Sequence, residues 1–222
     1  MRHSPHTLRR ICALGERVAA PEPFAPRFAP PLAPDEARID VAAFCYNDPG
    51  AIAAWFAAPL PGHRLILADD GSNPAARGLI DREIEADRDL VVLRWPHPRG
   101  PVTAANLAVA ASTSRTVAIA PSLAHIAAHL EATREALRSA RADFVVAFAP
   151  IDATGAPDFD AFMDAKSKVL LTQLGEAVLL VDRAAFSDIG GFNDTADLEY
   201  ASAVADMLSR AVRAEKSVLV FT

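Results

Sequence analysis

Cysteine is scarce in this chain of 222 residues, which contains only Cys12 and Cys45. Two cysteines cannot build a disulfide framework, and their spacing is not that of a metal-binding knot. We therefore expect both to be small buried side chains or free thiols. The cytoplasm is the simplest location for a protein with so few cysteines.

Long hydrophobic runs are also missing. No apolar run reaches the roughly 18 residues that a membrane-spanning helix needs. The start of the chain, Met1 to Arg10, is basic but is not followed by a long apolar segment. We expect no membrane span and no signal peptide.

Positive charge is in short supply, because 22 Lys and Arg residues face 28 Asp and Glu residues, for a net charge of −6. Nucleic-acid binding needs clustered Lys and Arg, so we expect no nucleic-acid partner. Hydrophobic residues nevertheless make up 51% of the chain. That is enough for a full core, which excludes a chain disordered throughout.

Proline is concentrated near the N-terminus, with six prolines between Pro21 and Pro34. Proline removes backbone donors and favours extended geometry. We expect residues 1–38 to form an N-terminal arm, with a short helix over 8–20 and an extended linker after it. The arm would pack on the domain through Phe24 and Phe28, or on a partner chain in a homo-oligomer; a partly ordered tail is the alternative.

Residues 39–222 alternate between strand and helix patterns and form the predicted domain. Short apolar runs predict strands at 39–46, 64–68, 90–95, 116–120, 144–148, 177–181 and 217–221. Helices are predicted at 51–58, 75–86, 102–111, 123–140, 183–189 and 198–215. This alternation favours right-handed βαβ units and a mostly parallel sheet, so the expected fold class is α/β.

Polar side chains follow the first three predicted strands. In an open parallel sheet, ligands bind beyond the carboxyl ends of the strands. Tyr46 can stack on a base, Asp69 or Asp70 can accept hydrogen bonds from a base or a ribose, and Arg99 can pair with a phosphate. The alternative is that the Asp-Gly-Ser-Asn sequence at 70–73 is a turn that caps a helix, with Arg99 a surface residue.

Four segments, in order, resemble family-2 glycosyltransferases. The opening strand at 39–47 runs into a Tyr-Asn pair, and the second strand at 65–72 ends in Asp-Asp-Gly-Ser. The Gly-rich helix start at 100–106 carries an Asn one turn in, and 179–194 holds an Arg-x-x-Phe helix followed by Gly-Gly-Phe-Asn. The resemblance implies a GT-A fold with a nucleotide-binding half followed by an acceptor-binding half. It also implies a nucleoside-diphosphate sugar bound by Tyr46, Asn47, Asp69, Asp70, Ser72 and Asn106, to which the position of Arg99 after the third strand adds a phosphate-binding candidate.

The chain departs from the family at the metal site. The resemblance implies an Asp-x-Asp pattern after the fourth strand, whose carboxylates hold Mg²⁺ or Mn²⁺ beside the diphosphate. Here residues 119–123 are Ile-Ala-Pro-Ser-Leu, without a carboxylate. We expect no metal at this position unless other ligands supply it. His125 and His129 share a helix face and are an alternative site for a softer metal, although a solvated pair is favoured.

The resemblance also implies a catalytic base in an acidic pair beyond Gly-Gly-Phe. Asp197 is the better match and Glu199 the second candidate, while helix-capping acids are the alternative. Two functions remain open. One is transfer of a sugar from a nucleoside diphosphate to an unknown acceptor, weak or metal-independent. The other is a non-catalytic relative, a pseudoenzyme that serves as a nucleotide-binding or interaction module.

Overall fold

The computed structural model describes residues 38–57, 62–86, 89–121, 141–148, 174–194 and 199–221, together with residues 126, 130, 134 and 135. Most of the sequence predicted as the N-terminal arm lies outside these residues, as does most of the helix predicted over 123–140. The arm's packing and its role in a homo-oligomer therefore stay predictions. Among the described helices, none combines the length and the apolar character needed to cross a membrane.

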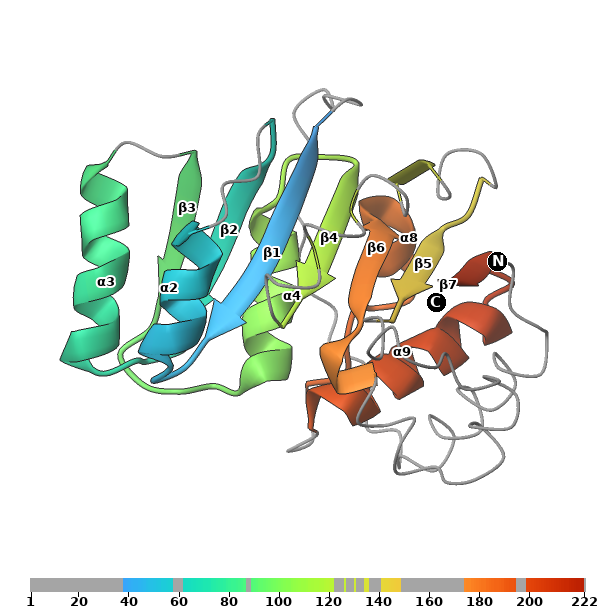
Figure 1. The fold of residues 1–222 in the computed structure, drawn as a ribbon. Helices are drawn as coiled ribbons and strands as arrows, with labels where there is room; N and C mark the ends of the chain where they lie inside the picture. Colours follow the sequence, from blue (N-terminus) through green and yellow to red (C-terminus); the bar gives the residue numbers. More distant parts are fainter. Residues whose placement is uncertain are drawn as a thin grey trace, which may run out of the picture.

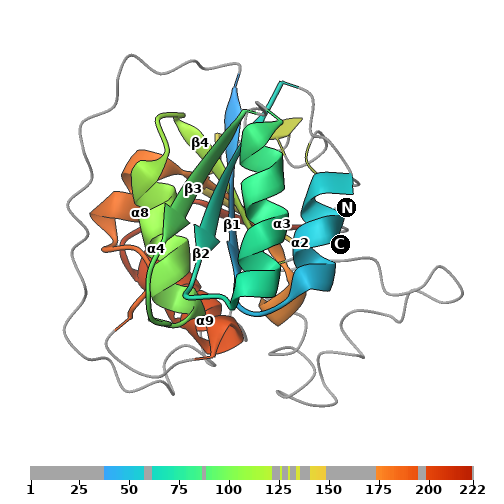
Figure 2. The same ribbon diagram turned by 90° about the vertical axis from the view of Figure 1, so that its left-hand side faces the viewer.

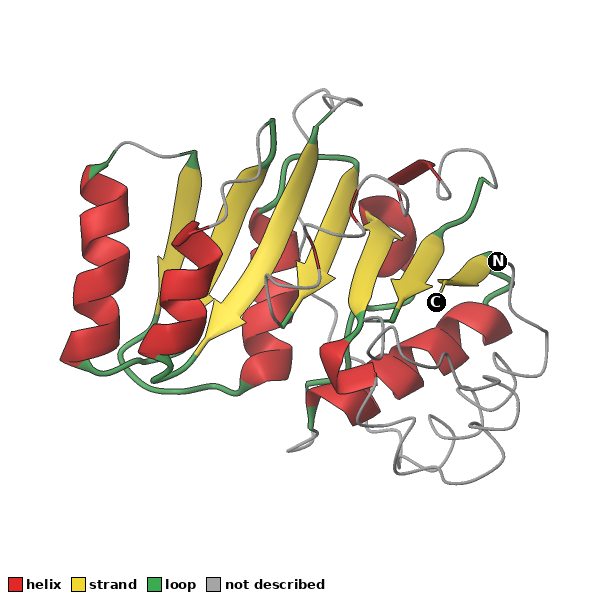
Figure 3. Ribbon diagram, viewed as in Figure 1, coloured by secondary structure: helices red, strands yellow, loops and turns green. Residues whose placement is uncertain are grey.

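The described chain forms one seven-stranded sheet in the order β3-β2-β1-β4-β6-β5-β7. The four strands from β3 to β4 are parallel, β6 is antiparallel to both of its neighbours, and β5 is parallel to β7. The mostly parallel sheet predicted from the sequence is confirmed (Figures 1 and 3). The strands are β1 (Ile39–Cys45), β2 (Arg64–Asp69), β3 (Leu90–Arg94), β4 (Thr116–Ala120), β5 (Phe144–Ala147), β6 (Val178–Asp182) and β7 (Val218–Phe221).

Helices cover both faces of the sheet, as the turned view in Figure 2 shows. One face carries α2 (Pro49–Ala57) and α3 (Pro74–Glu85), and the other carries α4 (Pro101–Ala111), α8 (Arg183–Asp188) and α9 (Tyr200–Arg213). The described ends of helices and strands agree with the predicted ones to within two residues. This three-layer arrangement is the α/β fold expected from the sequence.

The core lies in two layers because the central strands are buried on both faces. Successive side chains of a strand point to opposite faces, so Val41 and Ala43 pack with α2 and α3 while Ala42 packs with α4 and α9. A strand covered on both sides needs a continuous apolar run rather than an alternating one. That is why the first predicted strand is almost entirely apolar.

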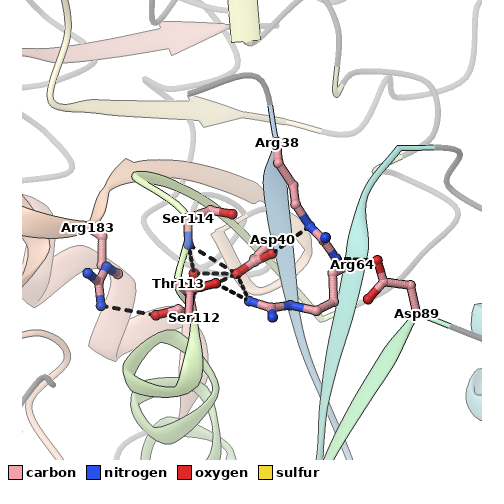
Figure 4. A network of polar contacts seen from close by, with 8 residues as sticks. All are labelled: Arg38, Asp40, Arg64, Asp89, Ser112, Thr113, Ser114 and Arg183. Carbon is pink, nitrogen blue, oxygen red and sulfur yellow. Dashed lines mark hydrogen bonds and ion pairs between the residues drawn. The ribbon is translucent and has the colours of Figure 1, made fainter. Parts of the chain in front are cut away.

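The amino-terminal ends of the strands are tied together by Asp40, a fully buried carboxylate on β1 (Figure 4). It forms an ion pair with Arg64 of β2 and accepts hydrogen bonds from the Ser112 hydroxyl at 2.7 Å and the Thr113 backbone N–H at 3.0 Å. The Ser114 N–H lies 3.3 Å from the same oxygen. We call this group the amino-edge network. It fixes the turn between α4 and β4.

Candidate functional site at the carboxyl edge of the sheet

Three parallel strands bring the predicted site residues to one edge. Cys45 at the end of β1 is in register with Asp69 at the end of β2, which is in register with Arg94 at the end of β3. The loops that follow these strands are therefore neighbours (Figure 1). We call this region, residues 45–48, 69–73 and 94–100, the carboxyl edge.

Asp69 is fully buried and shapes the turn after β2. Its Oδ1 accepts a hydrogen bond from the Ser72 backbone N–H at 2.9 Å, and its Oδ2 accepts one from Arg94 Nε at 2.9 Å. Arg77 Nε lies 3.7 Å from the same Oδ2. Arg94 also pairs with Asp81 of α3 at 2.9 Å. The Asp69 carboxylate thus has an electrostatic partner and a backbone partner within the protein.

Asp70, also buried, holds the loop that follows β3. Its two oxygens accept the backbone N–H groups of Arg99 at 2.7 Å and Gly100 at 2.8 Å. A Cβ at Gly71, where φ is +78°, would lie 2.7 Å from the His97 carbonyl carbon. The close approach of these two loops therefore requires glycine at that position.

The Tyr-Asn pair after β1 is hydrogen-bonded to the turn at residues 70–73. The Asn47 N–H donates to Ser72 Oγ at 3.1 Å, and Asn47 Oδ1 accepts from the Asn73 N–H at 2.7 Å. Asn47 adopts a positive φ of 52°, which asparagine tolerates better than most residues. Tyr46 is left 52% exposed.

Cys45, which directly precedes Tyr46, is buried at the end of β1. Burial, helped by the nearby Asp69 charge, raises the pKa of the Cys45 thiol to about 12. The buried, free thiol predicted from the sequence is confirmed for this cysteine. Cys12 lies outside the described residues.

Arg99 is exposed on the loop that Asp70 holds, and its guanidinium lies 5.8 Å from the centre of the Trp95 ring. A cation over an aromatic face is an attractive contact that keeps the guanidinium in place. The loops that carry Tyr46 and Arg99 are thus both hydrogen-bonded to one turn, residues 70–73, and both side chains are exposed.

Asn106 lies fully buried in α4 and bridges to the acceptor-side stretch. Its Nδ2 donates to the Phe192 carbonyl at 2.8 Å, and its Oδ1 accepts from the Phe192 N–H at 2.9 Å. Gly191, at φ +66°, leaves room for this bridge, because a Cβ there would lie 2.8 Å from Asn106 Oδ1. The nucleotide contact predicted for Asn106 stays a prediction, as do those of Asp69, Asp70 and Ser72; in the structure all four side chains are buried and tie loops together.

Of the predicted catalytic pair, Asp197 lies outside the described residues. Glu199 is exposed at the N-terminus of α9 and makes no capping hydrogen bond through its side chain. A nearby carboxyl that the sequence analysis did not select is Asp194, whose pKa is raised by burial and lowered in part by a hydrogen bond with the Thr103 side chain. Its position directly after Gly-Gly-Phe-Asn is the signal that could have found it.

Sequence analysis also missed Arg77 and Arg94, the cations around Asp69. Arg94 ends an otherwise apolar strand whose neighbour ends in Asp69, and parallel pairing brings the two side by side. Strand pairing is not visible in a single sequence, so only a correct strand order would have joined this pair.

The predicted metal position follows β4. Its described residues, Ala120 and Pro121, offer no side-chain oxygen, so they do not fit a hard divalent cation, which prefers oxygen ligands. Ser122, His125 and His129 lie outside the described residues. Within the described ranges, no three His, Cys, Asp or Glu side chains gather as metal ligands would. That no metal binds the full chain stays a prediction.

No protein-family model matches the sequence, and no curated protein matches it significantly in sequence. Solved structures do match its fold. Residues 1–349 of S. aureus TarS match with a TM-score of 0.59 and 13% identity, over 83% of this chain and 58% of that one. The mannosyltransferase PcManGT from Pyrobaculum calidifontis, in complex with GDP-Man and Mn²⁺, matches with a TM-score of 0.54 and 15% identity, over 97% of this chain and 63% of that one.

TarS has also been solved with UDP-GlcNAc, and that complex matches with a TM-score of 0.55, 14% identity and coverage of 83% of this chain and 56% of that one. The chain thus spans less than two thirds of each of these structures. At such identities the likeness defines the fold, which is GT-A-like and shared with glycosyltransferases.

Proposed function

We propose that this chain is a glycosyltransferase domain of the family-2 type that binds a nucleoside-diphosphate sugar at the carboxyl edge. The observation that carries the proposal is a pair of exposed groups, Tyr46 and Arg99, on two loops that both hydrogen-bond to the turn at 70–73. An aromatic face suits a base, and a guanidinium suits a diphosphate. Structural neighbours solved with UDP, UDP-GlcNAc and GDP-Man support this choice of ligand.

The proposed reaction is attack by an acceptor hydroxyl on the anomeric carbon. A new bond forms from the acceptor oxygen to that carbon, the bond from the carbon to the diphosphate oxygen breaks, and the nucleoside diphosphate leaves. Asp197 takes the hydroxyl proton, with Glu199 as the second candidate.

We expect this transfer to be slow. The described residues that end β4, Ala120 and Pro121, offer no side-chain oxygen to a hard divalent cation, and we propose that Arg99 takes up the charge of the leaving diphosphate. One preorganised electrostatic contributor is typically worth about 10²- to 10³-fold in rate, and a single guanidinium replaces a divalent cation incompletely. Binding of the nucleotide depends less on this electrostatic stabilisation than the rate of transfer does. The same observation at β4 favours the second candidate function, a nucleotide-binding module without transferase activity.

Calorimetry with UDP- and GDP-sugars, with and without Mn²⁺, tests the proposal. We expect binding at micromolar to millimolar concentrations, little changed by Mn²⁺. Tyr46→Ala should weaken binding by about 1–3 kcal/mol, the contribution of one base stacked on an aromatic ring. The matched control is Ile84→Ala, which removes an apolar side chain of similar exposure on α3, away from the site. If wild type binds no nucleotide at millimolar concentration, the proposal is wrong.

Product formation from the same sugars then separates the two candidate functions. A turnover within the usual range of roughly 1–10³ per second, unchanged by EDTA and abolished by Asp197→Asn, identifies an efficient metal-independent transferase. Binding without turnover identifies the non-catalytic module.

A further inference from the structure

The segment that begins with α8 runs back along α4 towards the carboxyl edge. At its start, Arg183 Nη1 donates to the carbonyl of Ser112, the residue after the end of α4, at 3.0 Å (Figure 4). Further along, the backbone of Phe192 is held by Asn106 in the middle of α4. The chain therefore travels along α4 from its C-terminal end towards its N-terminal end.

Asp194 reaches the first turn of α4, where the Thr103 hydroxyl donates a hydrogen bond to its carboxylate. Since α4 leaves the loop that follows β3, this first turn lies at the carboxyl edge. Thr103 comes four residues after Arg99, and a helix rises about 1.5 Å per residue. The residue that holds Asp194 is therefore within about one helical turn of the guanidinium-bearing residue that we assign to the diphosphate.

The backbone that precedes Asp194 is also held from α9. Arg210 donates to the carbonyl of Ile189 and, from Nη2 at 2.7 Å, to the carbonyl of Gly191. With Asn106 bonded to the next residue along the chain, the backbone is fixed from two helices up to two residues before Asp194. A side chain held in this way loses little further freedom when a ligand binds to it.

Asp194 is partly buried and partly open to solvent. Burial raises the pKa of its carboxyl, and the hydrogen bonds from its own backbone N–H and from Thr103 offset only part of this effect. A partly desolvated carboxylate is stabilised by each further donor. Sugar hydroxyls are such donors, and in a nucleoside-diphosphate sugar they lie next to the diphosphate that we assign to Arg99.

We propose that Asp194 accepts a hydrogen bond from a hydroxyl of the donor sugar, and that Thr103 is the residue that positions its carboxylate. This inference rests on the proposed function and extends it from the nucleotide to the sugar. The donor is then held at three points: the base by Tyr46, the diphosphate by Arg99 and the sugar by Asp194.

Calorimetry on the full chain compares UDP-GlcNAc with UDP, and GDP-mannose with GDP, in the presence of EDTA so that metal coordination makes no contribution. Asp194→Ala should raise the dissociation constant of the bound sugar nucleotide by about tenfold, as expected for a lost hydrogen bond to a charged acceptor. It should leave the matching diphosphate bound no more weakly than in wild type. Asp194→Asn should have a smaller effect, because an amide oxygen is a neutral acceptor. Thr103→Val should weaken the sugar nucleotide by about threefold, and Thr103→Ser, which keeps the hydroxyl, should not.

The matched control is Asp188→Ala, which removes an acid of the same segment. Asp188 is 61% exposed and pairs with Lys216 ahead of β7, so its loss should leave all four affinities unchanged. If Asp194→Ala leaves the sugar nucleotide unaffected, or weakens it and the diphosphate equally, the inference is wrong and the proposed function stands. An acid that only supports the fold, or only takes a proton from the acceptor, gives these results. Absence of binding of all four nucleotides to wild type overturns the proposed function itself, and this inference with it.

Discussion

The two edges of the sheet use buried aspartates in the same way and to different ends. At the amino edge, the Asp40 carboxylate forms an ion pair with Arg64 and accepts hydrogen bonds from the Ser112 hydroxyl and from the backbone N–H groups of 113 and 114. These partners belong to the turn between α4 and β4. At the carboxyl edge, Asp70 gathers two backbone N–H groups, and the loop that it holds presents Arg99 to solvent. A buried carboxylate thus marks a fixed loop, and the exposed groups on that loop decide whether the place is a binding site.

The largest effect is expected at the amino edge. Asp40→Ala removes the ion pairs with Arg64 and Arg38 and leaves the Thr113 backbone N–H without its acceptor. We expect a loss of about 3–5 kcal/mol in the free energy of unfolding, the range for breaking a buried charge pair from one side. Urea denaturation at pH 7 measures it. Nucleotide affinity of the folded fraction should not change, because the network lies at the opposite end of the strands.

The control for this variant is Asp89→Ala. Asp89 pairs with Arg38 but its side chain is 58% exposed, so we expect a loss of about 0–1 kcal/mol. If Asp40→Ala and Asp89→Ala lower stability equally, the amino-edge network is not the structural anchor described above.

A smaller effect on stability, joined to an effect on binding, is expected from Asp70→Ala. The variant leaves the Arg99 and Gly100 N–H groups without an acceptor, for a loss of about 1–3 kcal/mol. It also frees the loop that places Arg99, so we expect weaker nucleotide binding in calorimetry, which Asp40→Ala does not cause. Loss of stability with unchanged affinity would remove the distinction between the two edges.

The sequence alone predicts the strands and helices of this molecule better than it predicts the contacts between side chains. Strands and helices were accessible, because their apolar runs and the proline and glycine residues between them are local signals. The motif at 69–73 also located the carboxyl edge. The partners of Asp69 and Asn106 were not accessible: Arg94 and Phe192 reach them only through strand order and helix packing. From one sequence, a polar residue beside a site cannot be distinguished from one that builds the site.

The pH dependence of the free energy of unfolding should differ between wild type and Asp40→Asn. Burial raises the pKa of Asp40, but Arg64 and the hydrogen bonds from Ser112 and Thr113 outweigh it and hold the pKa below its usual value. A carboxyl with a lowered pKa stabilises the fold above its unfolded pKa of about 3.9, and that contribution is lost as the pH falls through the folded value. The stability difference between wild type and Asp40→Asn should therefore shrink as the pH falls below about 4.

Thermal unfolding at intervals from pH 6 to pH 3 measures this difference, with Ile84→Ala as the control that removes no titrating group. A difference that stays constant over this range would show that the charge of Asp40 does not contribute to stability.

The last prediction concerns the access of solvent and reagents to Cys45 at the carboxyl edge, and it is expected to involve the smallest effect on stability and binding. Cys45 is the last residue of β1, and burial holds its thiol protonated, with a pKa of about 12. Since the thiolate is the reactive form, labelling by a disulfide reagent at pH 8 should be about 10³-fold slower in the folded protein than in urea, given an ordinary thiol pKa of about 8.5. Cys12→Ser makes Cys45 the single thiol of the chain, because the sequence has only two cysteines. Labelling that is fast in the folded state and slowed by bound UDP would show that this edge opens without a ligand, unlike the edge that Asp40 closes.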